Sequence, residues 1–139
     1  MSSEEKRTWI SALVGFVVPV VYLAVVMSKV PGADVAGIGY VVPMLASIGI
    51  GIGAGIVLAI VAAVASPQDA DRTDERDREI NRRGEYVAFY VMSGAAIVPL
   101  ALAMAEVEQF WIAHALYLAF VLAALTSSVV KIVAYRRGW

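Results

Sequence analysis

The sequence has no cysteine, only one histidine and comparatively few charged residues. Charged side chains make up 17% of its 139 residues, whereas hydrophobic side chains make up 60%. The lack of cysteine excludes a disulfide framework, a thiolate metal site and a cysteine nucleophile. The net charge of -1 gives no excess of one sign that would point to nucleic acid or another polyanion. A composition this apolar is typical of a protein whose main solvent is lipid.

Four apolar runs lack charged residues, and each is long enough to cross a bilayer. They are residues 9–27, 38–65, 86–105 and 110–130. A hydrocarbon core about 30 Å thick needs roughly 20 helical residues. The first run exceeds the apolar region of a secretory signal, so we expect it to be retained as a span. The second run has 28 residues, and Gly37, Gly39 and Pro43 predict that it starts irregularly.

The basic residues predict how these spans are oriented. Ten of the eleven lie before the first span, in the loop of residues 66–85, or after residue 130, which leaves only Lys29 elsewhere. By the positive-inside rule, both termini and this loop are cytoplasmic. Short connections between spans predict an all-α polytopic membrane protein, with residues 1–139 forming one antiparallel four-transmembrane-helix bundle. An interfacial aromatic belt is expected from Trp9, Tyr86, Phe110, Trp111 and Tyr135. Lys131 is expected to extend toward the cytoplasmic headgroups.

The second span carries small residues at every fourth position. They are Ser47, Gly51, Gly55, Ala59 and Ala63. Such a stripe lets two helix backbones approach closely, so it predicts a helix-packing face. We favour packing within the bundle, and an interface in a homo-oligomer is the alternative. Pro19, Pro43 and Pro99 each remove a helical hydrogen bond and permit kinks, but proline is common in membrane helices and needs no functional role.

Ionisable groups are nearly absent from the spans, which argues against transport and catalysis. Small multidrug transporters share the size and span number of this chain, but they depend on a carboxylate in the first helix, which this sequence lacks. His114, near Glu106 and Glu108, is too small a ligand set for a metal, and we expect it to bond a backbone carbonyl. We predict no metal, no cofactor and no enzymatic activity. A hydrated path lined by Ser47, Ser93, Tyr117 or Thr126 would instead favour transport.

The most distinctive segment is the charged part of the loop between the second and third spans. It contains Asp74, Glu75, Arg76, Asp77, Arg78 and Glu79. Ser66 or Thr73 is expected to cap a short helix here. Pairs four residues apart, Asp74 with Arg78 and Glu79 with Arg83, would stabilise that helix.

Two residues that follow the charged segment carry further expectations. Ile80 is expected to dip toward the membrane, and Gly84 to break or bend the chain before the third span.

The charges of residues 74–79 are mixed, so the segment is not a polybasic lipid-binding patch. It is either a solvated linker or a surface that docks a partner.

The run Asp-Glu-Arg-Asp-Arg-Glu-Ile at residues 74–80, followed by Gly84-Glu85-Tyr86 at the start of the third span, resembles a family of small bacterial membrane proteins. The likeness is to actinobacterial hypothetical four-helix proteins of a domain-of-unknown-function family, and it covers nearly the whole chain. Members of the wider family are often encoded beside small helix-turn-helix regulators. The resemblance implies a bacterial plasma membrane location and a link to signalling, but no activity or site residues.

These observations favour a noncatalytic membrane adaptor or sensor. In this hypothesis the charged loop docks a cytoplasmic regulator protein, and the bundle sits in the lipid bilayer. The alternative is a small oligomeric channel or transporter that uses the glycine face of the second span. Direct binding of nucleic acid is not expected.

Overall fold

The computed structural model describes residues 3–65 and 74–138, which are almost entirely helical. The helices are α1 (Ser3–Met27), α2 (Val41–Ala65), α3 (Glu75–Ala95), α4 (Ile97–Met104) and α5 (Gln109–Arg137), with short 3-10 turns η1 (Val30–Gly32) and η2 (Val35–Gly37) between α1 and α2. Four stretches are long and apolar enough to cross a membrane, with α3 and α4 together forming the third. The expected all-α class and four candidate spans are therefore confirmed.

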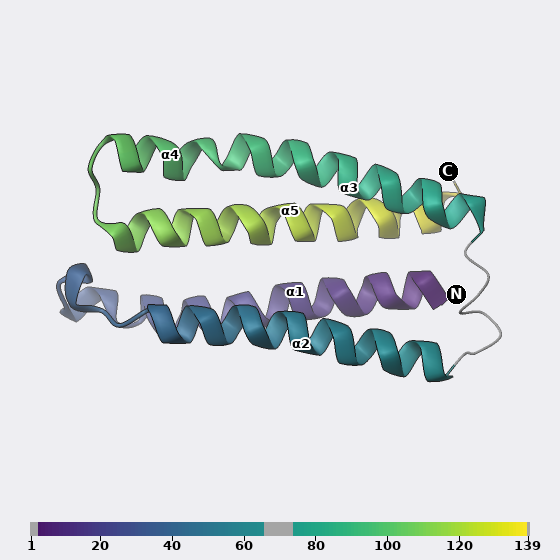
Figure 1. The fold of residues 1–139 in the computed structure, drawn as a ribbon, viewed down its shortest axis with the longest axis horizontal. Coiled ribbons are helices and arrows are strands. Elements are labelled where there is room, and N and C mark those ends of the chain that lie inside the picture. The colour runs from purple at the N-terminus through teal and green to yellow at the C-terminus, as the bar shows by residue number, and fades with distance from the viewer. Residues whose placement is uncertain (1–2, 66–73, 139) are drawn as a thin grey trace.

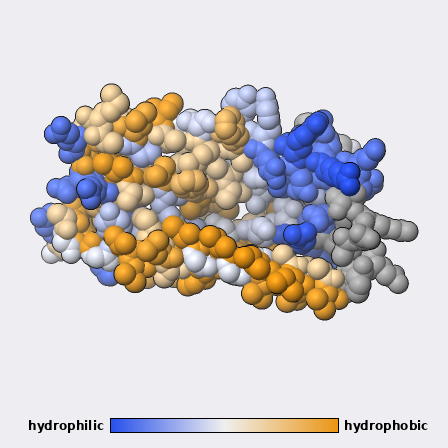
Figure 2. Space-filling model, viewed as in Figure 1, coloured by the Kyte–Doolittle hydropathy of each residue, from blue (hydrophilic) through white to orange (hydrophobic). Residues whose placement is uncertain are grey.

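The long helices run side by side along the longest axis of the molecule (Figure 1). Both termini lie at one end, which we call the terminal end, and the α1–α2 and α4–α5 connections lie at the other, the connecting end (Figure 1). Helix α5 contacts α1, α3 and α4, whereas α2 packs mainly on α1. Large apolar side chains remain exposed along the helices. Figure 2 shows them along the middle of one face, with hydrophilic residues gathered toward its ends. This pattern suits a bundle whose sides contact lipid.

The three prolines have different effects on the helices. Helix α1 continues through Pro19. Pro43 lies in the first turn of α2, where its missing N–H removes no helical hydrogen bond, so the expected loss is wrong at this position. The residues before it are irregular as predicted. The third span is interrupted at Ala96, three residues before Pro99. Pro99 has no N–H to donate to the carbonyl four residues earlier. The break therefore falls where the proline was expected to permit a kink.

Helix α4 ends in a compact turn that reverses the chain toward α5. The Glu106 N–H donates to Ala103 O and the Val107 N–H donates to Leu102 O, both at 3.1 Å. This pair of bonds is the Schellman motif, which satisfies carbonyls at a helix end. Glu106 has a φ of 53°, in the left-handed region where glycine is usual. The short connection predicted at residues 106–109 is thus a closed hydrogen-bonded turn.

Candidate functional site

The charged segment forms the start of α3 at the terminal end. The Asp74 carboxylate accepts a hydrogen bond from the Glu75 N–H at 2.7 Å and caps the helix. The predicted caps Ser66 and Thr73 lie outside the described residues. Asp74 is therefore used as a cap, and the Arg78 backbone N–H donates to its carbonyl at 3.2 Å. The side chains of this segment that remain exposed are Asp74, Glu75, Arg76 and Arg78.

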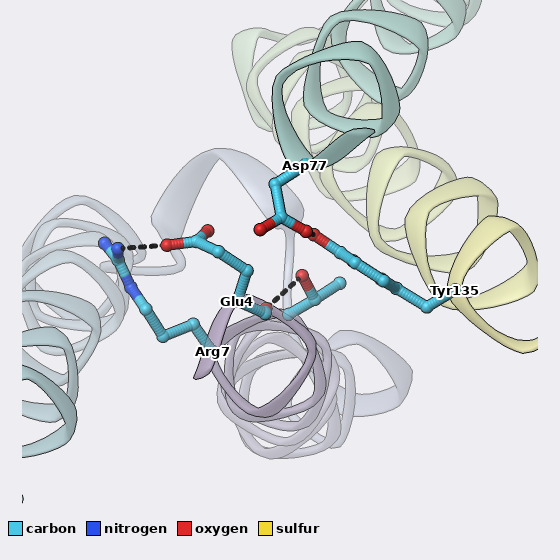
Figure 3. Close-up of polar contacts among 5 residues, drawn as sticks. Glu4, Arg7, Asp77 and Tyr135 are labelled. Atoms are coloured by element: carbon cyan, nitrogen blue, oxygen red, sulfur yellow. Dashed lines mark hydrogen bonds and ion pairs between the residues drawn. The ribbon is translucent and has the colours of Figure 1, made fainter. Parts of the chain in front are cut away.

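Asp77 differs from its charged neighbours because it is buried. It is 8% exposed, and the Tyr135 hydroxyl of α5 donates to its carboxylate at 3.0 Å. In Figure 3 the two side chains point toward each other from α3 and α5. A carboxylate in the first turn of a helix is also favoured by the helix dipole. Asp77 was predicted to be a docking residue. That prediction is wrong, because its carboxylate is buried and already accepts a hydrogen bond from Tyr135.

Glu79 organises the two arginines that follow the docking residues. Its carboxylate pairs with Arg82 at 2.7 Å and with Arg83 at 2.9 Å. The second pair confirms the predicted contact at a spacing of four residues. Glu79 is half-buried, and its carboxylate is paired with both arginines. It therefore contributes only partly to the exposed docking face.

Ile80 and Gly84 are buried positions of α3. Ile80 is 2% exposed, so the expectation that it dips into the membrane is wrong. Helix α3 also continues through Gly84, so the expectation that this glycine breaks the chain is wrong. A Cβ at Gly84 would lie 2.5 Å from Lys131 Cε and 2.7 Å from Lys131 Cγ. A larger residue here would have to displace the lysine side chain, which crosses α3 at this point. Sequence spacing could not reveal a contact between such distant positions.

A small polar cavity lies among α1, α3 and α5, beside the Asp77–Tyr135 pair. Its volume is about 160 Å³, and Asn81 from α3 and Lys131 from α5 line it with polar side chains of α1. Lys131 therefore borders this cavity as well as Gly84. On α1, Arg7 pairs with the Glu4 carboxylate at 3.0 Å (Figure 3). This cavity could not be predicted from the sequence, because its residues come from three helices.

A second polar group is buried near the connecting end. His114 Nδ1 lies 2.7 Å from the Phe110 carbonyl, as predicted for a histidine bonded to the backbone. A carbonyl oxygen only accepts, so Nδ1 carries a hydrogen, and Nε2 shares a hydrogen bond of 2.8 Å with the Tyr22 hydroxyl. Phe110 is 2% exposed and packs on His114, so its predicted place in an aromatic belt is wrong.

The same group ties α2 to the rest of the molecule. Ser47 of α2 and Tyr117 of α5 share a hydrogen bond of 2.7 Å, and Tyr117 packs edge-on against Tyr22 of α1. Three helices therefore meet through polar aromatic contacts in a region that is otherwise apolar. Interhelical hydrogen bonds of this kind hold membrane helices together.

The other hydroxyls considered for a transport path do not join this group. Ser93 donates to Phe89 O at 2.8 Å, and Thr126 donates to Leu122 O at 2.7 Å. Ser93 is exposed and Thr126 is half-buried, and each hydroxyl bonds its own helix. Within residues 3–65 and 74–138, no three His, Cys, Asp or Glu side chains gather as a metal site would require.

Only one residue of the small-residue stripe of α2 is buried. Ser47 is buried against Tyr117, but a Cβ added to Gly51 or Gly55 would meet no atom within 4 Å. Ala59 is half-buried and Ala63 is exposed. The favoured prediction, close packing of these glycines inside the bundle, is therefore wrong. Helix α2 lies at the edge of the bundle, where the glycine groove faces open space.

Comparison of the chain with protein-family models, curated proteins and solved structures gives no match. The resemblance to small actinobacterial four-helix proteins therefore stays a prediction.

Proposed function

We propose that this protein is a noncatalytic membrane adaptor or sensor whose charged α3 start docks a cytoplasmic regulator protein. The observation that carries the proposal is that the first turns of α3 are held in place while their charged side chains remain exposed. The hydrogen bond between Asp77 and Tyr135 holds the first turns of α3 against α5, and Ile80 is buried on the same turns. Glu75, Arg76 and Arg78 remain exposed on those same turns. Charges held on a rigid helix favour partner discrimination, because the partner need not order a loose segment.

The proposal includes a bacterial plasma membrane location and an antiparallel bundle with both termini in the cytoplasm. The basic residues support this orientation, because ten of eleven belong to the segments assigned to that side. The chain has no native cysteine, so single cysteines report sidedness without background. We expect a cysteine at Arg137 to react with an impermeant maleimide only after the membrane is opened, and one at Ala33 to react in intact cells. The reverse pattern would contradict the orientation.

Signalling would require the docking face to respond to the membrane, and α5 provides a physical connection. Tyr135 and Lys131 of α5 contact α3 at Asp77 and Gly84. The same helix carries Tyr117 at the other buried polar group. A displacement of α5 along its axis would therefore disturb both groups. We propose that envelope or lipid state is read through α5 and presented by α3.

The arrangement of hydroxyls favours an adaptor over a channel or transporter. A conducting path needs polar groups that face water within the bundle. Ser47 and Tyr117 satisfy each other, whereas Ser93 and Thr126 bond their own helices. These contacts support the proposal of a noncatalytic, nontransporting role.

The test is purification of the tagged chain from its native membrane, followed by mass spectrometry of the intact complex. We expect the parent chain to copurify with one stoichiometric cytoplasmic protein. The double variant Glu75→Lys, Arg78→Glu should no longer recover that protein. A matched Arg137→Gln variant changes another exposed charge at the same end and should retain that protein. Equal recovery with both variants, or no stoichiometric partner with the parent chain, would contradict docking at this segment.

A further inference from the structure

A large groove opens between α3 and α5 on the side of the bundle at the terminal end. Its volume is about 760 Å³, within the usual range for pockets that hold small molecules. Val87 of α3 and Val129, Val130 and Val133 of α5 form its wall. No described helix covers the groove, so its apolar wall faces the surroundings of the bundle. Apolar wall residues in this position suit a hydrocarbon chain.

The rim of the groove has a different chemistry from its wall. Arg82 and Arg83 border the groove together with Glu79 and Tyr86. Each arginine uses one nitrogen on the Glu79 carboxylate, and their side chains are 78% and 54% exposed. A guanidinium has five N–H donors in a fork that matches phosphate geometry, so both retain donors for a ligand. Two arginines against one carboxylate leave the rim with one net positive charge.

The order of these groups along the bundle identifies the ligand class. The arginines lie toward the charged start of α3, and Val87, Val129 and Val130 lie toward the apolar middle of the helices. Val133 lies between Lys131, which meets Gly84, and Tyr135, which bonds Asp77, so it is level with the arginines. Tyr86, whose hydroxyl lies 3.0 Å from the Tyr90 hydroxyl, stands between them as interfacial tyrosines do. A ligand that fills the groove must therefore be anionic at one end and apolar at the other. Basic pockets between membrane helices recognise lipid headgroups by this combination.

We propose that the α3–α5 groove is a binding site for an anionic phospholipid, whose phosphate contacts Arg82 and Arg83 and whose acyl chain lies along the valine wall. This site adjoins the docking face and shares Glu79 with it, but Glu75, Arg76 and Arg78 do not line the groove. Only the choice of the cytoplasmic leaflet depends on the orientation proposed above. The mixed charge of the preceding segment gives no polybasic patch, so selectivity comes from the groove and two arginines.

The test is native mass spectrometry of the full chain in detergent, with phosphatidylglycerol or phosphatidylcholine of identical acyl chains added. The parent chain should retain phosphatidylglycerol in clear preference. Replacing both Arg82 and Arg83 with Gln should lower its retention by about fivefold for each arginine, to near that of phosphatidylcholine. The matched Arg76→Gln, Arg78→Gln variant removes two charges from the same helix outside the groove and should leave retention unchanged.

A second variant tests the wall separately from the rim. Val133→Trp should fill the groove and lower phosphatidylglycerol retention, whereas Leu122→Trp, on the same helix outside the groove, should not. Glycerol phosphate, which has the headgroup anion but no chain, should not displace the lipid. Equal retention of both lipids by the parent chain, equal loss from both arginine pairs, no effect of Val133→Trp, or displacement by glycerol phosphate would each overturn the proposal.

Discussion

The two ends of the bundle are built differently. Near the connecting end, the core contains Tyr22, Val26, Phe110 and Tyr117, and its polar atoms bond one another or the backbone. At the terminal end, fewer side chains are buried, and charged residues border a cavity and a groove. Polar groups in the first region join helices to helices, whereas many in the second remain accessible to other molecules. We therefore infer that the connecting end maintains the fold and the terminal end interacts.

The largest expected effect comes from closing the contact that joins α3 to α5 at the terminal end. Gly84→Leu should destabilise the bundle by about 3 kcal/mol, because the added side chain overlaps Lys131 and must displace it. Gly94→Leu is the matched control in the same helix, since a Cβ there meets no atom within 4 Å. Thermal unfolding in detergent measures both variants. Equal stability of the two would contradict the close approach at Gly84.

Removal of the buried hydrogen bond at the terminal end should have the next largest effect. Tyr135→Phe leaves the Asp77 carboxylate without its hydroxyl donor, which should cost about 1 to 2 kcal/mol. The docking segment should then become more mobile than the rest of α3. Hydrogen exchange of residues 74–80 measures that change. Unaltered exchange and unfolding would show that the Asp77–Tyr135 pair does not fix the segment.

A hydrogen bond at the connecting end should contribute less. Ser47→Ala should lower stability by about 1 kcal/mol, because it removes the side-chain bond between α2 and α5. Ser93→Ala is its control, since that hydroxyl is exposed and bonds its own helix. Unfolding curves of both variants, recorded in one detergent, should separate them. A smaller loss for Ser47→Ala than for Ser93→Ala would contradict the structural role of this end.

The smallest expected effect is at the glycine stripe, which belongs to neither polar group. Gly55→Leu should change the stability of the isolated chain by less than about 0.5 kcal/mol, because open space surrounds that position. Unfolding and the mass of the intact species measure the outcome together. Loss of an oligomer would indicate that a second copy covers α2. A large loss of stability in a monomer would contradict the position of α2 at the edge.

Sequence patterns predicted the spans well and the contacts between them poorly. The irregular start of α2, the break before Pro99 and the Glu79–Arg83 pair all depend on neighbouring residues, so local spacing was sufficient. Hydropathy, however, does not distinguish a helix face that contacts lipid from one that contacts protein. The glycines of α2 were consequently predicted to pack, although they face open space.

The candidate sites were only partly predictable for a related reason. The charged residues 74–78 stand out in the sequence. Which of them is buried does not, because the Asp77 carboxylate bonds Tyr135, which is 58 positions away. Likewise, Tyr22 and His114 are 92 positions apart. One feature of the sequence does bear on such pairs: isolated polar residues within apolar helices need partners, and Tyr22, Ser47, His114 and Tyr117 are of this kind. Their pairing required the helix packing.

Site-specific photocrosslinking in native cells tests most directly whether the terminal end interacts. A photoreactive amino acid would replace Arg76 or Arg78 on the docking face, Asp77 between them, or Ala33 at the connecting end. We predict that Arg76 and Arg78 crosslink one and the same cytoplasmic protein, whereas the Asp77 position crosslinks within the chain and Ala33 does not yield that protein. Absence of a shared product at Arg76 and Arg78, or the same product at Ala33, would contradict a docking face at the start of α3.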